Sequence, residues 1–221
     1  MVLSACYRQS GKETAAVLLQ QYLYRKFTVS FSCVCRGTGE GGNQAGAYMA
    51  GQMLQWFRAL DPEKLAQNPE KAIRRAALGI GGTIRRIDRE LENGRAGTGR
   101  TGFAGFFCIG SRYMMFGRGD FRICTVNTAF GRAYMRRLLP DGYRGEAAET
   151  AVEAGILQPG IGLLLATESF YGHIPDAVIK EGLYAGGGDT EDGMRRRLKE
   201  LAEEGARRGA VGIGAVYLRT V

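Results

Sequence analysis

Two helix-like segments follow one another directly in this chain, between strand-like segments on both sides. Residues 44–60 and 69–92 each repeat apolar residues at helical spacing, three or four positions apart. The Asp61-Pro62 pair between them indicates a helix end followed by a new helix start. Because these helices are grouped and not alternated with strands, the order favours a layered α+β fold over a doubly wound parallel sheet.

Short apolar runs rich in β-branched and aromatic residues predict the strands. One run, residues 27–35, precedes the helices, and the runs that begin at Phe103 are separated by glycine-containing turns. That spacing predicts an antiparallel meander. Residues 162–167 and 213–220 predict two further strands, whereas the polar, Arg-rich residues 127–150 predict a connection.

Two helices are predicted in the last quarter of the chain. Residues 175–183 fit a short helix that begins at a proline. Residues 190–208 fit a longer one, with Thr190 as N-cap, acidic residues in the first turn and arginines at the end.

Composition places the chain among ordinary globular proteins. It has 221 residues, of which 45% are hydrophobic and 24% charged, and we expect one domain over residues 1–221. No apolar run is long enough to span a membrane, and the start of the chain lacks the pattern of a secretory signal. Five cysteines without a CxxC pair predict free thiols in a reducing cytoplasm and argue against a structural zinc.

The single histidine and the net charge narrow the function classes. With His173 alone, the chain cannot build a His-rich metal site, and a Ser-His-Asp mechanism would have to use this residue. A loop histidine is the simpler interpretation. The net charge of +8 raises nucleic-acid binding as an alternative, but basic residues are scattered among acidic ones and no RNP-like motif is present.

Glycine supplies 34 residues, several of them in a loop between the strand 27–35 and the first helix. In this loop Gly37, Gly39 and Gly42 match the GxGxxG pattern of dinucleotide sites. Asp61 lies about twenty positions on, as that motif requires, but it follows the helix directly and no second strand carries it. The βαβ unit is therefore incomplete, and a dinucleotide site is not favoured.

Five segments match, in order, the motifs of one protein family. Residues 8–13 resemble Arg-x-x-Asn-Glu-Asp, and residues 38–46 resemble Asp-Gly-Met-Gly-Gly-His-x-x-Gly between a strand and a helix. Gly119-Asp120-Phe121-Arg122 resembles Gly-Asp-Ser-Arg, residues 164–170 resemble Leu-Leu-x-Ser-Asp-Gly-Leu, and residues 209–217 resemble Gly-Ser-x-Asp-Asn-Ile-Thr-Val-Val-Val. Together they resemble the metal-dependent protein phosphatases of the PP2C (PPM) family over almost the whole chain.

This resemblance implies a fold and an activity. The fold is a four-layer α-β-β-α sandwich, with two mostly antiparallel sheets flanked by helices. The activity is that of a bacterial-type, single-domain serine/threonine phosphatase, a phosphomonoester hydrolase in which two Mn²⁺ or Mg²⁺ ions activate a bridging water. Such hard ions prefer carboxylate oxygens.

The resemblance also assigns roles to individual residues. Arg8 corresponds to the phosphate-binding arginine. Glu13, Gly39, Asp120 and Glu168 correspond to metal-site positions, with Gly39 contributing its carbonyl oxygen.

Other positions depart from the family pattern. Lys12 replaces a glutamate, and Thr38 replaces the aspartate that would bridge both metals. Either Val211 or Gly212, depending on a one-residue gap, replaces the last metal-binding aspartate, and neither can ligate through its side chain. We therefore expect the fold to be kept and the two-metal site to be absent or crippled, with no cofactor or only weakly bound Mn²⁺ or Mg²⁺. Restoring acidic residues at these three positions would remove half of the +8 charge.

The function that follows is a pseudophosphatase, a signalling module that regulates or binds a phosphoprotein or a serine/threonine kinase. One alternative is an active phosphatase that uses Glu13, Asp120 and Glu168 with substitute ligands. Nucleic-acid binding is the weaker alternative, and the oligomeric state stays open. A cluster of arginines, Arg132, Arg136 and Arg137, fits either an acidic or phosphorylated partner or a purely solubilising role.

Overall fold

A computed structural model describes residues 2–9, 15–94, 100–119, 121–129, 132–137, 150–184 and 190–220. The strands are β1 (Val2–Arg8), β2 (Ala16–Tyr24), β3 (Phe27–Thr38), β4 (Arg100–Ile109), β5 (Arg112–Arg118), β6 (Phe121–Ala129), β7 (Arg132–Arg137), β8 (Ala151–Ile156), β9 (Gly162–Thr167) and β10 (Gly214–Thr220). The helices are α1 (Gly42–Arg58), α2 (Pro62–Gln67), α3 (Pro69–Glu92), α4 (Glu168–His173), α5 (Asp176–Tyr184) and α6 (Glu191–Arg207).

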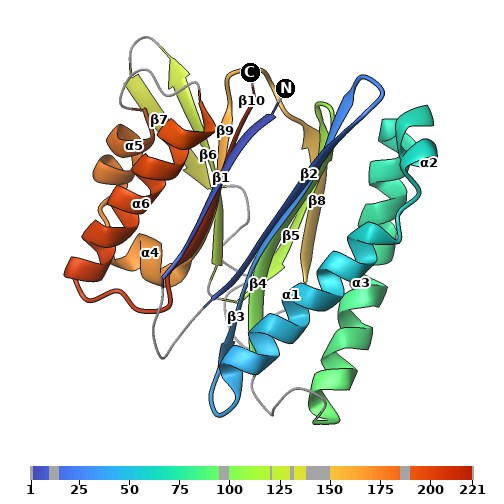
Figure 1. Ribbon diagram of the computed structural model, residues 1–221, viewed down its shortest axis with the longest axis horizontal. Coiled ribbons are helices and arrows are strands. Elements are labelled where there is room, and N and C mark those ends of the chain that lie inside the picture. Colours follow the sequence, from blue (N-terminus) through green and yellow to red (C-terminus); the bar gives the residue numbers. More distant parts are fainter. Residues whose placement is uncertain are drawn as a thin grey trace.

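Within these ranges the strands form two five-stranded sheets that face each other (Figure 1). The first sheet has the order β1-β10-β9-β6-β7, and the second has the order β2-β3-β4-β5-β8. Every pair of neighbouring strands is antiparallel. In the first sheet, β1 and β10 bring the two ends of the chain together, with Val2 opposite Thr220.

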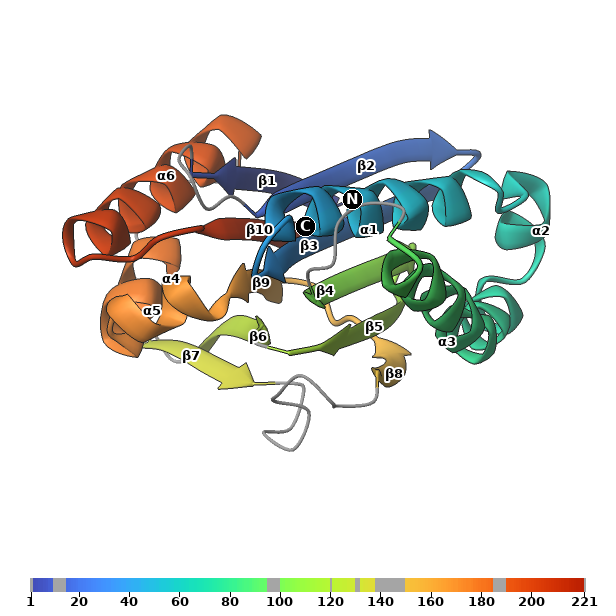
Figure 2. The same cartoon turned by 90° about the horizontal axis from the view of Figure 1, so that it is seen from below.

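Helices cover the outer face of each sheet, which gives four layers (Figure 2). One apolar cluster lies between the second sheet and the helices α1 and α3, and another lies between the first sheet and α4, α5 and α6. A third cluster fills the space between the two sheets. The predicted α-β-β-α sandwich with antiparallel sheets is therefore confirmed.

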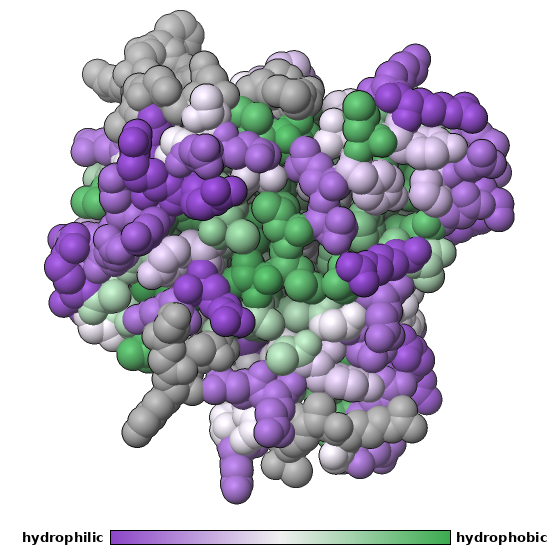
Figure 3. Space-filling model, viewed as in Figure 1, coloured by the Kyte–Doolittle hydropathy of each residue, from purple (hydrophilic) through white to green (hydrophobic). Residues whose placement is uncertain are grey.

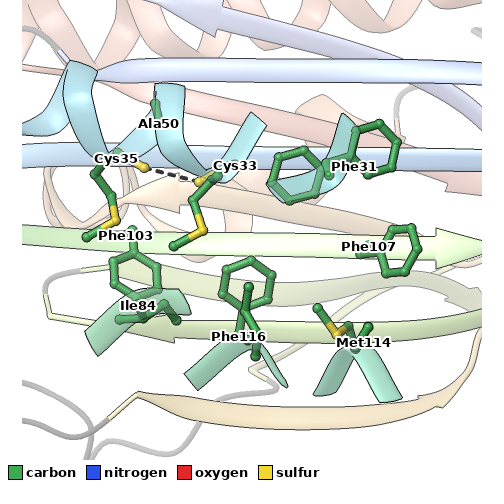
Figure 4. Packing of buried hydrophobic residues seen from close by; sticks show 14 of the residues in the cluster. Phe31, Cys33, Cys35, Ala50, Ile84, Phe103, Phe107, Met114 and Phe116 are labelled. Atoms are coloured by element: carbon green, nitrogen blue, oxygen red, sulfur yellow. Dashed lines mark hydrogen bonds between the residues drawn. The ribbon is translucent and has the colours of Figure 1, made fainter. Parts of the chain in front are cut away.

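Strands with two covered faces explain the continuous apolar runs in the sequence. All six residues of β9 are buried, because Leu163 and Leu165 face the other sheet while Leu164 and Ala166 face the helices. The inner strand β3 behaves in the same way, and its Phe31, stacked on Phe57 with ring centroids 5.1 Å apart, faces α1. Figure 4 shows this packing, with side chains of β3, β4 and β5 meeting those of the two helices.

Side-chain caps start several helices where the sequence predicts a start. The Asp61 carboxylate accepts a hydrogen bond from the Glu63 backbone N–H at 2.9 Å, and Thr190 Oγ1 accepts one from the Gly193 N–H at 3.2 Å. The cap at Asn68 accepts from the Lys71 N–H at 2.9 Å and begins α3. No helix in the described part of the chain is both long and apolar enough to cross a membrane.

Two sequence-based expectations about the middle of the chain are wrong. The runs after Phe103 do not form one meander: β4 and β5 pair in the second sheet, whereas β6 crosses to the first sheet and pairs with β7 and β9. Residues 132–137, expected in a connection, form β7. The sheet of β6 was missed because strands of both sheets are covered on two faces, so their apolar runs look alike and do not say to which sheet a strand belongs.

Candidate functional site

The candidate site consists of Arg36, Arg122, Glu168, Ser169 and Gly212. They come from the end of β3, the start of β6, the first turn of α4 and the loop before β10. These segments are far apart in the sequence and are brought together because β6, β9 and β10 are neighbours in the first sheet while β3 runs in the facing sheet. Hydrogen bonds join Arg122 to Glu168 and Arg36 to Ser169, and the Arg36 guanidinium also lies beside Gly212.

An ion pair joins Arg122 to Glu168. The guanidinium donates to both carboxylate oxygens, with Nε 2.9 Å from Oε2 and Nη2 bonded to Oε1. Its carbon lies 5.1 Å from the centroid of the Tyr171 ring, so the group is also stacked on an aromatic face. Burial of the guanidinium lowers its pKa, but the hydrogen bonds and charge of Glu168 outweigh this, and the pKa of Arg122 lies above its usual value.

A second guanidinium, that of Arg36, lies beside Gly212. Its Nη1 donates to Ser169 Oγ at 3.1 Å. A Cβ atom added to Gly212 would lie 3.1 Å from Nε and 3.2 Å from the guanidinium carbon of Arg36. Gly212 also has a φ of 66°, in the left-handed region that favours glycine. A larger residue at position 212 would therefore need both backbone strain and a displaced Arg36.

Gln9 fixes the loop that carries Gly212. Its side-chain Nε2 donates to the Ala210 carbonyl at 3.3 Å, and its Oε1 accepts from the Ile213 N–H at 3.1 Å. Its backbone N–H donates to the Ile213 carbonyl at 2.9 Å. Sequence reasoning missed this residue, whose one available signal is its position beside Arg8.

This chain is similar to known proteins in its structure. No family model and no curated protein matches the sequence. Among solved structures, PppA, described as a key regulatory component of T6SS in Pseudomonas aeruginosa, matches with a TM-score of 0.70 and 16% identity, covering 100% of this chain and 98% of that one. The serine/threonine phosphatase Stp1 from Staphylococcus aureus matches with a TM-score of 0.70 and 14% identity, covering 100% and 95%. The catalytic domain of the phosphatase PstP, in complex with two manganese ions, matches with a TM-score of 0.61 and 14% identity, covering 98% and 96%.

This chain has the fold of the bacterial PP2C-type serine/threonine phosphatases. The similarity extends over the whole chain, so it confirms the resemblance in fold that the ordered motifs predict.

Three of the predicted site residues lie at the ends of β1 and β3 or in the turn that follows β3. Arg8 is exposed at the end of β1, where its backbone pairs with Gly214. Thr38 is exposed at the end of β3, and Gly39, with a φ of 80°, begins the turn into α1. The Gly39 carbonyl, assigned to a metal by resemblance, accepts a hydrogen bond from the Gly42 N–H at 3.0 Å. Lys12, Glu13 and Asp120 lie outside the described residues.

The glycine loop before α1 is required by backbone packing. A Cβ atom on Gly37 would lie 1.9 Å from the Gly42 carbonyl oxygen, a distance that no side chain could tolerate. This close approach accounts for two glycines of the GxGxxG match without a bound dinucleotide.

His173 and Val211 both lie within the described residues. His173 ends α4 and is exposed, with Nδ1 3.0 Å from the Ser169 carbonyl oxygen, so it lies in a helix and not in the expected loop. Val211 is 52% exposed, and its side chain is apolar.

At the described positions that the resemblance assigns to metals, one carboxylate is present, that of Glu168. Both oxygens of Glu168 are bonded to Arg122, and Thr38 and Gly212 offer no carboxylate. Across the part of the chain that the structure describes, no three His, Cys, Asp or Glu side chains lie close enough together to hold a metal ion. The guanidinium groups of Arg122 and Arg36 lie against Glu168 and Gly212 and add positive charge at these two positions.

Proposed function

We propose that this chain is a non-hydrolytic PP2C-fold module that regulates or binds a phosphoprotein or a protein kinase. The single observation that carries the proposal is the bonding of Glu168 to Arg122. Both oxygens of the Glu168 carboxylate accept hydrogen bonds from the partly buried guanidinium of Arg122. These two bonds must break before the carboxylate can ligate Mn²⁺.

Arg36 supports the proposal independently. Its guanidinium lies against Gly212, one of the two positions that correspond to the last metal-binding aspartate of the family. An aspartate there would contact Arg36 instead of a metal. Among the described positions, the chain thus pairs Glu168 with one arginine and places another beside Gly212.

The Arg36 guanidinium suits a phosphorylated partner. Planar guanidinium groups bind phosphate oxygens through paired hydrogen bonds, and they do so without a metal. We therefore propose a phosphorylated serine or threonine segment of a signalling protein in the reducing cytoplasm as the partner. The regulatory description of PppA, a protein with the same fold, fits this role.

A hydrolysis assay distinguishes a non-hydrolytic module from an active phosphatase. The purified chain is incubated with p-nitrophenyl phosphate and with a phosphothreonine peptide in excess Mn²⁺, beside the Glu168→Ala variant. We expect no product above the rate of the buffer for either protein. Turnover by the wild type that Glu168→Ala abolishes would establish the active phosphatase and refute the proposal.

Peptide binding tests the positive half of the proposal. Fluorescence anisotropy compares phosphorylated and unphosphorylated forms of labelled peptides from a degenerate Ser/Thr library. We expect preferential binding of the phosphorylated form, a loss of about tenfold in Arg36→Gln, and no loss in Arg75→Gln, which removes the same charge from the exposed face of α3. Equal binding of both peptide forms would argue against a phosphoprotein partner.

A further inference from the structure

The outer strand β2 has a free edge. Its nine residues pair with β3 in unbroken register, from Ala16 opposite Cys35 to Tyr24 opposite Phe27. In the described part of the chain β3 is the only strand that pairs with it, and all nine residues are at least partly exposed. The backbone N–H and C=O groups on the opposite edge are therefore positioned to pair with another strand.

The outer strands β7 and β8 carry features that discourage such pairing, and side chains bond to the backbone of β1. The strand β7 contains three arginines in six residues, and β8 contains Glu153 and spans only six residues. At β1, the Val2 carbonyl accepts from Gln21 Nε2 at 2.7 Å, and the Ser4 N–H donates to Glu191 at 3.1 Å. In contrast, residues 16–24 contain no charged residue and no proline.

The helix beside β2 extends this uncharged surface. α1 packs next to the strand, with the Tyr22 and Phe57 rings 5.8 Å apart (Figures 1 and 2). Residues 42–57 of α1 also contain no charged residue, although 24% of the whole chain is charged. Ala47, Gly51 and Gln55 are exposed on it. Depletion of charged residues marks the core of protein interfaces.

The figures place apolar surface on the same side of the molecule. Figure 3 shows hydrophobic residues in the middle of the face on which β1 and β2 lie. Leu23, near the end of β2, is 72% exposed. An exposed and apolar outer strand is a surface that proteins normally cover.

The net charge of the chain restricts which surfaces of two copies can meet. Each copy carries +8, so two copies repel each other wherever basic residues face one another. At the uncharged surface of β2 and α1, a second copy can approach with the least local repulsion between basic side chains.

The residues of β2 are also complementary to themselves. In an antiparallel pair centred on Gln20, Leu18 lies opposite Tyr22 of the second copy, and Val17 lies opposite its Leu23. Apolar side chains then meet on both faces, and the two Gln20 residues meet at the centre. A two-fold axis requires this kind of self-complementary surface.

We propose that two copies of this chain associate through β2, which pairs antiparallel with β2 of the second copy about a two-fold axis at Gln20. The second sheets of the two copies then form one continuous ten-stranded sheet, twice the five strands of each copy. This association does not depend on whether the candidate site binds phosphate or metal.

Light scattering after size-exclusion chromatography tests the association. The wild type is expected at twice its mass of 24.0 kDa, and Leu23→Lys is expected at the monomer mass. Leu78→Lys, at a leucine 88% exposed on α3, is the matched control and should stay dimeric. Far-ultraviolet circular dichroism confirms that each variant is folded. A monomeric wild type at every concentration, or a dimeric Leu23→Lys, would overturn the proposal.

Cross-linking tests the geometry. Residues directly opposite each other in an antiparallel pair have Cα atoms about 4.5–5.5 Å apart, within the range of a disulfide. Gln20→Cys, in a background where the exposed Cys6 is replaced by serine, should form a covalent dimer on mild oxidation, and Leu78→Cys in the same background should not. Failure of Gln20→Cys to cross-link more than Leu78→Cys would refute the two-fold axis at Gln20.

Discussion

At the scale of single residues, Arg122 and Glu168 join two elements that the chain separates by 46 positions. The side chains are 22% and 33% exposed, so water screens the pair in part but does not remove the need for a partner. Removing the arginine leaves the Glu168 carboxylate partly buried without its two hydrogen bonds. Leaving this carboxylate without a partner lowers the stability by more than the intact pair adds to it.

Arg122→Ala should therefore lower the free energy of unfolding by about 1–3 kcal/mol. Arg122→Lys keeps the charge but cannot form the two-pronged bond, so its loss should be smaller. Urea unfolding curves of the three proteins measure both effects. Equal stability of Arg122→Ala and the wild type would show that the pair does not hold α4 against β6.

Cysteine exposure gives a second residue-scale prediction. Cys6 is exposed, whereas the other four cysteines are buried, and burial raises the pKa of Cys108 to about 12. Because the thiolate is the reactive form, a colorimetric thiol reagent at pH 8 should modify one cysteine in the native protein and five after denaturation. Cys6→Ser should give none in the native state. Rapid modification of two or more native thiols would contradict the buried positions of Cys33, Cys35, Cys108 and Cys124.

At the scale of elements, α3 remains helical through three glycines. Its buried stripe, which includes Ile73, Ile80, Ile84 and Ile87, packs on the second sheet and outweighs the poor helix propensity of glycine. Packing of the buried stripe thus stabilises the helix where the glycines favour it least.

Gly79→Ala and Gly82→Ala should each stabilise the protein by up to about 1 kcal/mol. Both glycines are helical, and a Cβ atom there would meet nothing within 4 Å. Gly37→Ala is the opposite case, since its Cβ would lie 1.9 Å from a carbonyl oxygen, and it should destabilise strongly. Thermal unfolding midpoints rank the three variants, and destabilisation by Gly79→Ala would contradict the helix through that point.

The sequence predicts elements better than it predicts their neighbours. The long helices could be predicted because an apolar stripe and a cap, such as Thr190, are local features. The sheet to which β6 belongs could not be predicted, because strands of both sheets are covered on two faces and have similar apolar runs. Glu168 was identified through a motif, but its partner Arg122 was not, although Gly119-Asp120-Phe121-Arg122 is the best match to the family. A contact across 46 residues depends on strand order, which no local pattern encodes.

At the scale of the whole molecule, buried thiols and a buried phenol make stability depend on alkaline pH. Burial raises the pKa of Cys35 and of Tyr171 well above their usual values, and that of Cys108 to about 12 from 9.0. In the unfolded chain these groups lose their protons first. Between the unfolded and folded pKa values the native state binds more protons, so stability falls as the pH rises.

We therefore expect these groups to have no effect on the unfolding free energy below pH 8, and a decrease with rising pH above pH 9. Cys108 alone should contribute a slope of about 1.4 kcal/mol per pH unit between its unfolded and folded pKa values. Urea unfolding from pH 7 to 11 measures the slope, and Cys108→Ala should reduce it by one such increment. An unchanged slope in Cys108→Ala would contradict the buried thiol.

The whole fold is that of a metal-dependent phosphatase, while the described site pairs its acidic residue with arginine. Titration calorimetry of the wild type with Mn²⁺, beside Glu168→Gln, tests this claim most directly. We predict no saturable binding of two ions and no difference between the two proteins. Binding of two Mn²⁺ ions per chain that is lost in Glu168→Gln would show that Glu168 leaves Arg122 to ligate metal, and would contradict the account.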